Sequence, residues 1–315
     1  MKVRPVVVLL LLLLAAAAPL SAQTRVHVEK LADGVWAGIP DRGANVGWFV
    51  IGDGVIAVDS GGDNATGEAI LKAIAESTGG KPVKAVVITH AHGDHAGGAR
   101  AFTAAGARII CQESIAGQIL ALVLQSKGGA DDPLAAKPNA KPVVEALSER
   151  SIMVDGIHNA QVFFLGAAHS KGDMVVYLVN DKILFIGDLA SNGRMPFMQS
   201  PDVDPDGWER ALAALSHVAV DKMVPGHGQV GPASGLLESA AYVHAVNQLA
   251  HKFVAAGMND ELVNIQIHAP ENQIKGLEVS DEHAQNVKAA VRFEREKAAK
   301  KAATPAATPA APAKK

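Results

Sequence analysis

The segment formed by residues 86–95, VVITHAHGDH, constrains this chain more than any other part of the sequence. Its first three residues are β-branched and apolar, and they predict a buried strand. His90 and His92 are two residues apart, so in extended backbone they project to the same side and can bind one metal ion. Asp94 and His95 follow where the chain turns toward a helix, and they could serve a second ion. Three imidazoles and a carboxylate suit zinc or a similar first-row metal, whereas an ordinary polar loop would leave their order unexplained.

Three further residues lie at the ends of predicted strands or in turns, where they could act as metal ligands. His169, Asp188 and His227 each end a largely apolar run, and glycines beside Asp188 and His227 permit close backbone approach. Each of them alone also fits a purely structural role, such as a capping carboxylate, a buried histidine with its hydrogen-bond partners, or a turn residue. Their value as evidence comes from their combination with the first segment.

In that combination the chain resembles the metallo-β-lactamase superfamily of binuclear metallohydrolases, which includes glyoxalase II-like enzymes. The resemblance runs over about residues 26–256. It implies an α/β (α+β) fold, the four-layer αββα sandwich, with metal ligands on loops at one edge of the two sheets. The ligands that it implies are His90, His92 and His169 for a first metal, Asp94, His95 and His227 for a second, and Asp188 bridging the two.

The implied chemistry is hydrolysis with two Zn²⁺ ions, iron or manganese being alternatives. A hydroxide shared by the two ions would attack a small carbonyl substrate, since metal-bound water ionises near neutral pH. Asp94 would act in catalysis by orienting this nucleophile or by passing a proton to the leaving group. Asp59, Thr89 and Asp173 are candidates for fixing the imidazole tautomers, although each also fits a structural role.

The substrate is less constrained. In the best-known β-lactamases of this superfamily a cysteine ligates the second metal where this chain has Asp188, and Cys111, the single cysteine, stands elsewhere and fits a small buried apolar residue. We therefore expect a thioester, lactone, ester or lactam rather than β-lactams alone. Arg194 could line the pocket and bind a substrate carboxylate, or it could be a solvated loop charge.

Two other functions remain open at this point. Similar ligand sets can hold iron, which would make the chain a redox enzyme, and a non-catalytic metal-binding accessory protein needs no open coordination position. The expected partner is a small-molecule substrate. A net charge of −3 provides no basic field for nucleic acid. The sequence does not indicate an oligomeric state.

The chain divides into three parts. Residues 1–22 predict a signal peptide, because Lys2 and Arg4 precede an apolar run. We therefore expect a periplasmic or secreted protein with no stable membrane insertion after cleavage. An uncleaved membrane anchor is the alternative. Residues 23–300 would form the hydrolase domain with C-terminal helices. Residues 301–315, rich in Ala, Pro and Lys, predict a disordered tail. Residues 127–142 predict a long surface loop, which could be a lid over the site or an insertion with a structural role only.

Periodicity and turn residues predict the elements of two similar halves packed face to face. Strands are expected within 26–39 and 47–59, at 86–88, and at 161–165, 174–179, 183–186 and 222–224. Helices are expected at 66–77, 96–105, 114–125, 206–218, 233–256 and 278–300.

Overall fold

The computed structural model describes residues 24–125, 132–135, 137, 139–153, 156–274 and 280–303. The predicted signal peptide lies outside the described residues, as do residues 304–315 of the predicted tail and part of the loop at 127–142. The first three residues of that predicted tail belong to the last helix, because Lys301, Ala302 and Ala303 continue its helix-favouring run of Ala and Lys. The predicted boundary at residue 300 is therefore three residues early.

The first sheet has seven strands in the order β1-β2-β3-β4-β5-β6-β7. The first four pair antiparallel, and β4 to β7 pair parallel. The two strand regions predicted before residue 60 are four strands, since a turn interrupts each of them. The bounds are β1 Val26–Ala32, β2 Val35–Pro40, β3 Val46–Ile51, β4 Gly54–Val58, β5 Val83–Val87, β6 Arg108–Gln112 and β7 Val144–Leu147.

The second sheet has five strands in the order β12-β11-β10-β9-β8. Its strands pair antiparallel except β11 and β12, which pair parallel because α5 and the segments around it connect them. The bounds are β8 Arg150–Met153, β9 Ala160–Phe164, β10 Met174–Leu178, β11 Ile183–Gly187 and β12 Lys222–Pro225.

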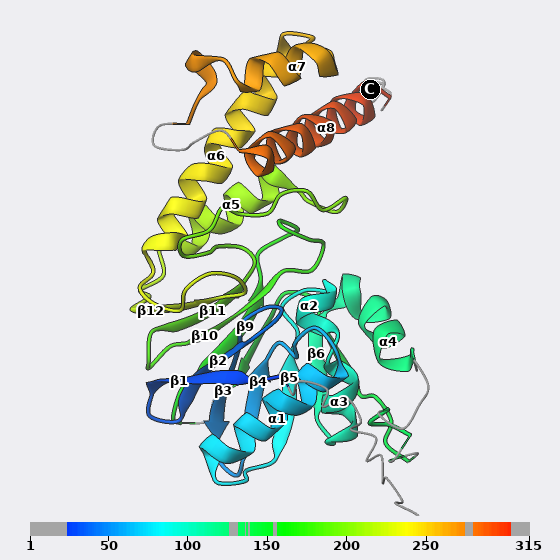
Figure 1. Cartoon of the computed structure of the whole chain (residues 1–315), viewed down its shortest axis with the longest axis vertical. Coiled ribbons are helices and arrows are strands. Elements are labelled where there is room, and N and C mark those ends of the chain that lie inside the picture. Colours follow the sequence, from blue (N-terminus) through cyan, green and yellow to red (C-terminus); the bar gives the residue numbers. More distant parts are fainter. Residues whose placement is uncertain are drawn as a thin grey trace, which may run out of the picture.

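Helices cover the outer face of each sheet, which confirms the four-layer αββα architecture (Figure 1). Helices α1, α3 and α4 cover the first sheet, α5 and α6 cover the second, and α7 and α8 lie beyond α6. The bounds are α1 Asn64–Thr78, α2 Gly93–Ala96, α3 Ala99–Ala104, α4 Ala116–Leu124, α5 Pro205–Leu215, α6 Ser234–Ala255, α7 Asp260–Ile267 and α8 Asp281–Ala303.

Three apolar clusters fill the spaces between these layers. One lies between the first sheet and its helices and contains Trp48 and Phe102. A second lies between the two sheets and contains Phe49 and Phe185. The third joins the second sheet to α5, α6, α7 and α8 and contains Trp208. The C-terminal helices are thus packed into the core of the second half.

The helix predicted at 96–105 is two short helices, α2 and α3, separated by Gly97 and Gly98. A Cβ at Gly97 would lie 2.1 Å from the carbonyl oxygen of Gly62, and one at Gly98 would lie 2.1 Å from that of Ser60. The close contacts require glycine at both positions, and the helix is interrupted there. Strands β7 and β8 and helix α7 were not predicted.

The architecture brings four loops together. The loop after β5 carries His90 and His92 and leads into α2, which carries Asp94 and His95, and the loops after β9, β11 and β12 carry residues 169, 188 and 227. Strands β5, β11 and β12 therefore point their carboxyl ends at one edge of the sandwich. Among the described helices, none combines the length and apolar character that crossing a bilayer would require.

Candidate metal centre

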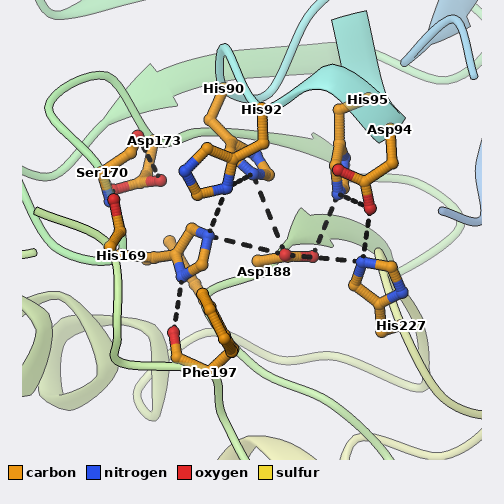
Figure 2. A network of polar contacts seen from close by, with 12 residues as sticks. His90, His92, Asp94, His95, His169, Ser170, Asp173, Asp188, Phe197 and His227 are labelled. Atoms are coloured by element: carbon orange, nitrogen blue, oxygen red, sulfur yellow. Dashed lines mark hydrogen bonds and ion pairs between the residues drawn. The ribbon is translucent and has the colours of Figure 1, made fainter. Parts of the chain in front are cut away.

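Seven side chains from these loops converge on one region (Figure 2). They are all seven of the residues that the sequence predicted as ligands, and their role as metal ligands stays a prediction. They form two groups, and within each group the possible ligand atoms lie within 4.8 Å of one another. The first group is His90, His92, His169 and Asp188, and the second is Asp94, His95 and His227.

The first group has the dimensions of a tetrahedral site. His92 Nδ1 lies 3.0 Å from both His90 Nε2 and His169 Nε2. Asp188 Oδ2 lies 3.8 Å from His90 Nε2 and 3.5 Å from His169 Nε2. Four donors about 2.1 Å from a tetrahedral zinc ion are separated by about 3.4 Å. The observed separations lie on both sides of this value.

The second group lies on the other side of Asp188. His227 Nε2 is 2.9 Å from Asp94 Oδ2, and His95 Nε2 is 3.9 Å from the same oxygen. Asp188 Oδ1 is 3.2 Å from His95 Nε2, and Asp188 Oδ2 is 3.6 Å from His227 Nε2. Asp188 therefore contacts histidines of both groups and stands between them in Figure 2, as a bridging ligand would.

Polar groups behind the first-group histidines determine which ring nitrogen faces the cluster. His169 Nδ1 lies 3.0 Å from the carbonyl oxygen of Phe197, which can only accept. Thr89 Oγ1 donates to Asp59, so at 3.1 Å it accepts from Nδ1 of His90. Protons on these Nδ1 atoms leave each Nε2 lone pair directed at the cluster, which is the arrangement that a metal ligand needs.

Asp59 supports the second group. Its Oδ2 lies 2.8 Å from His95 Nδ1, and its Oδ1 accepts from the backbone N–H of Thr89. The backbone of Asp59 has φ of 63°, a left-handed conformation that costs energy for a residue other than glycine. Asp59 and Thr89 therefore have the contacts predicted for them. Asp173, the third candidate, instead binds Ser170 beside His169 through the backbone N–H and the hydroxyl.

Burial and neighbouring charges separate the pKa values of these groups. Burial holds the pKa of His90 well below its ordinary value and lowers that of His169 to about 4, so both rings are neutral at pH 7. Burial acts on His95 in the same direction, but the carboxylates of Asp188 and Asp59 outweigh it and raise its pKa well above the ordinary value. Burial opposes ionisation of Asp188, yet the surrounding histidines hold its pKa well below its usual range.

The chemistry of the donors fits metal ions. His92 Nδ1 faces two histidine nitrogens at 3.0 Å, and one proton could satisfy only one of these contacts. His95 Nε2 and Asp188 Oδ1 are buried and have no hydrogen-bond partner among the described residues, although they face each other. Buried polar atoms without partners are costly, and a cation between them would satisfy all of these atoms at once. Imidazole nitrogens with carboxylate oxygens are the ligand set that zinc prefers.

The cluster opens into a cavity of about 240 Å³. Four of the predicted ligands line it, and Arg194 lines it too, as the sequence suggested; the four are His92, Asp94, Asp188 and His227. The remaining lining residues are Ala190, Ser191, Met195, Pro196, Phe197 and Glu282. The cavity is smaller than the sites that hold drug-sized ligands, so it suits a small substrate or one end of a larger one.

A third group of potential ligands lies apart from this centre. Asp206, His251 and Glu294 are close together on α5, α6 and α8. Lys297 Nζ lies 2.6 Å from Asp206 and 2.8 Å from Glu294, so one ammonium group already forms an ion pair with each carboxylate. We therefore interpret this group as an ion-pair network between helices.

Two supporting contacts could not be predicted from the sequence. The carbonyl of Phe197 has no signature in a sequence, because every residue carries a carbonyl group. Asn45 donates from Nδ2 to the carbonyl oxygens of Pro225 and Gly228 at 2.9 Å and so holds the loop that carries His227. An asparagine 180 residues before its partner in the chain could not be linked to that loop from spacing.

Comparisons with known proteins agree with this geometry. A family model described as the metallo-beta-lactamase superfamily matches residues 39–227. A "Metallo-beta-lactamase type 2" from Bacillus sp. (strain 170) is 28% identical over 189 residues, covering 59% of this chain and 67% of the relative. A "Linear primary-alkylsulfatase" from Pseudomonas sp. (strain ATCC 19151) is 26% identical over 217 residues, covering 58% of this chain and 40% of the relative.

The fold is also similar to solved structures. A metallo-beta-lactamase from Pontibacter korlensis superposes with a TM-score of 0.57 at 24% sequence identity. The superposition covers 70% of this chain and 99% of that protein. At this level of identity the likeness concerns the fold.

Proposed function

The chain belongs to the metallo-beta-lactamase superfamily and is a hydrolase of that fold, and we propose that it is exported and uses two zinc ions to cleave a small carbonyl substrate. The observation that carries the proposal is the convergence of seven ligand residues beneath an open cavity. A closed structural zinc site would have no such opening.

Two ions rather than one are favoured by the division of the ligands. Each group contains at least two histidines and one carboxylate within reach, and Asp188 contacts both groups. His90, His92 and His169 would hold one ion, Asp94, His95 and His227 the other, with Asp188 shared. Zinc bound there supplies Lewis-acid polarisation of a carbonyl group and activation of water at neutral pH.

Asp94 is the residue with the chemistry to move a proton. Burial opposes its ionisation, but the contact with His227 and the charge of His95 lower its pKa, so it is a carboxylate at neutral pH. Its side chain is 38% exposed and lines the cavity, unlike the more buried Asp188. A carboxylate in this position can orient a water molecule and deliver a proton to the leaving group.

The cavity supports a substrate with a carbonyl group and an anionic substituent. Arg194 lines the wall and has no ion-pair partner within the described part of the chain, so its guanidinium is available for a substrate carboxylate. Met195, Pro196 and Phe197 add an apolar surface beside it. Thioesters, lactones, esters and lactams with a carboxylate nearby fit this combination.

Export rests on the amino-terminal sequence. A short basic segment followed by an apolar run and small residues is typical of a secretory signal. When the full-length sequence is expressed in a bacterial host, cell fractionation should recover the protein from the periplasm or the medium. A variant without residues 2–22 should stay in the cytoplasm, and recovery of both forms from the cytoplasm would contradict the proposal.

The test of activity compares the hydrolysis of three kinds of bond: a β-lactam amide, a thioester and a sulfate ester. We would assay the zinc-loaded protein with a chromogenic β-lactam, a model thioester and an alkyl sulfate, each with a chelator-treated control, and measure bound metals. Chelator-sensitive turnover of the β-lactam or the thioester is expected. Turnover of the alkyl sulfate alone would contradict a carbonyl substrate, and near-stoichiometric iron with oxygen consumption would favour redox chemistry.

A further inference from the structure

Asn286 connects the C-terminal helix α8 to a loop of the metal centre. The residue is fully buried, and its Oδ1 accepts a hydrogen bond from the backbone N–H of Met198 at 3.0 Å. Its Nδ2 donates to the carbonyl oxygen of Pro196 at 2.8 Å and to the hydroxyl of Tyr242 at 2.9 Å. The reversed amide would place oxygen against the Pro196 carbonyl, so only this orientation satisfies these contacts.

The two backbone groups that Asn286 binds flank Phe197. The carbonyl oxygen of Phe197 accepts the hydrogen bond from Nδ1 of His169 at 3.0 Å, and in Figure 2 Phe197 lies on the opposite side of the His169 ring from His92. This hydrogen bond sets the orientation of the ring and leaves Nε2 directed at His92 and Asp188. Because Pro196 and Met198 are both held, the carbonyl between them has little freedom to move.

The support for this loop is anchored in the core. Tyr242 accepts from Asn286, so its own hydroxyl proton is available for His283 Nδ1 at 3.1 Å. Tyr242 lies on α6 and His283 on α8, and both are buried. The chain of contacts therefore runs from the packing of two helices to one ring of the metal centre.

We propose that Asn286 is a positioning residue that raises the metal affinity of the group formed by His90, His92, His169 and Asp188. It acts through the carbonyl of Phe197 and touches neither metal nor substrate. The inference rests on the proposed function only in requiring that this group binds a metal ion. It assigns α8, which follows the segment matched by the family model, an indirect part in the centre through the backbone around Phe197.

The test compares two buried asparagines. Asn286→Ala removes the hydrogen bonds to Pro196 and Met198. Asn247→Ala is the matched control, because Asn247 is also buried and donates from Nδ2 to the carbonyl oxygen of a proline, Pro205, at 2.9 Å. Metal-free proteins would be titrated with Zn²⁺ against a chromophoric chelator. Mutation of a group that is hydrogen-bonded to a metal ligand typically costs about 10–100-fold in metal affinity, and Asn286 holds the backbone that provides this group for His169. We expect a loss of this size in one of the two binding steps of Asn286→Ala, and less than about twofold in the control.

A second readout follows the His169 ring itself. In zinc-loaded protein, NMR of ¹⁵N-labelled histidine should show faster exchange or a shift of the Nδ1 proton of His169 in Asn286→Ala. The Nδ1 proton of His95, which is bound to Asp59, should be unchanged. A role limited to packing would not distinguish these two rings.

The outcomes separate this inference from the proposed function. Equal zinc affinities in Asn286→Ala and the parent, or equal losses in Asn286→Ala and Asn247→Ala, would overturn the inference and leave the proposed function intact. A parent protein that binds no zinc would overturn both. If circular dichroism shows that Asn286→Ala is unfolded, Tyr242→Phe is used in its place, because this substitution removes only one hydroxyl group. Tyr242→Phe should weaken the same zinc-binding step less strongly than Asn286→Ala would. An unchanged zinc affinity in Tyr242→Phe would then overturn the inference.

Discussion

At the scale of single residues, burial and neighbouring carboxylates together set the protonation state of each buried ring in the centre. His90, His95 and His169 have no solvent exposure, and a charged imidazole without a partner carboxylate is costly there. Asp59 and Asp188 provide that partner for His95. The metal-free protein therefore keeps neutral rings in the first group and a charged ring in the second, so binding of a metal to the second group must release the Nε2 proton of His95.

The pH dependence of stability in the metal-free protein should reflect His169. Its pKa is about 4 when folded and about 6.5 when unfolded, so between these values the unfolded chain binds a proton that the folded chain does not. Stability attributable to this ring is therefore present above pH about 6.5 and is lost as the pH falls toward 4, by up to about 3 kcal/mol. Urea unfolding of chelator-treated protein at pH 7 and pH 5 measures the loss.

His169→Gln removes this titration and should reduce the difference in unfolding free energy between pH 7 and pH 5. His217→Gln serves as the control, because His217 is an exposed residue after α5. An equal pH dependence in the parent and in His169→Gln would show that the buried ring does not govern acid stability.

Asp94→Ala should abolish turnover or lower kcat by at least about 100-fold, the usual contribution of a positioned acid or base. The substitution removes the cavity-lining carboxylate 2.9 Å from His227 Nε2. Steady-state kinetics on the preferred substrate measure the effect. Asp33→Ala, at an exposed aspartate paired with Lys30, should keep full activity, and full activity in Asp94→Ala would refute the role of Asp94.

The residues of the centre were more predictable than their supports. His90, His92, Asp94 and His95 crowd into six positions, a density that an ordinary loop does not require. The supports are a carbonyl of Phe197 and the amides of Asn45 and Asn286, which act across long stretches of chain. Spacing in the sequence contains no signal for such contacts, because only the folded chain brings their partners together.

At the scale of elements, prediction succeeded where periodicity was strong. Helix α1 begins after its N-cap Asp63 and ends before its C-cap Gly79, close to the range expected from spacing and turn residues. Strands β7 and β8 have four residues each, and Val144–Leu147 is only partly buried, so alternation had too few positions to be visible. Helix α7 buries Val263 and Ile267 but exposes Leu262 and Ile265, which weakens its amphipathic pattern.

The loop after β12 depends on a residue without a side chain. A Cβ at Gly226 would lie 2.1 Å from Asp188 Oδ1 and 2.5 Å from His95 Cε1. Gly226→Ala should therefore displace Asp188, weaken zinc binding and lower kcat/KM by at least about 100-fold, since a shift of about 1 Å in a reacting group can have that cost. Kinetics and zinc titration measure these effects.

Gly231→Ala is the matched control for Gly226→Ala. Gly231 lies in the same loop between β12 and α6, and an added Cβ there would meet no atom within 4 Å. This variant should behave as the parent does. If Gly226→Ala also retains full zinc affinity and activity, the loop does not approach Asp188 as closely as the structure places it.

At the scale of the whole molecule, the centre joins the two halves of the sandwich. The segment after β5 of the first sheet, which includes α2, supplies four of the seven residues, and the loops after β9, β11 and β12 of the second sheet supply three. Each half alone would present an incomplete set of donors. The expectation of two halves packed face to face is confirmed, and metal ions bound between them would cross-link the sheets at one edge.

Zinc should therefore stabilise the entire fold. A ligand that binds only the folded chain adds about 2.7 kcal/mol at a free concentration 100 times its Kd, which for a domain of this size raises Tm by on the order of 5–10 °C. Thermal unfolding of chelator-treated protein, followed as Zn²⁺ is added, should show a Tm that rises until two equivalents are bound. Mg²⁺ prefers octahedral oxygen ligands and should produce no comparable rise. Saturation at one equivalent would mean that Asp188 completes a single site, and an unchanged Tm would mean that the seven side chains do not cross-link the halves through metal.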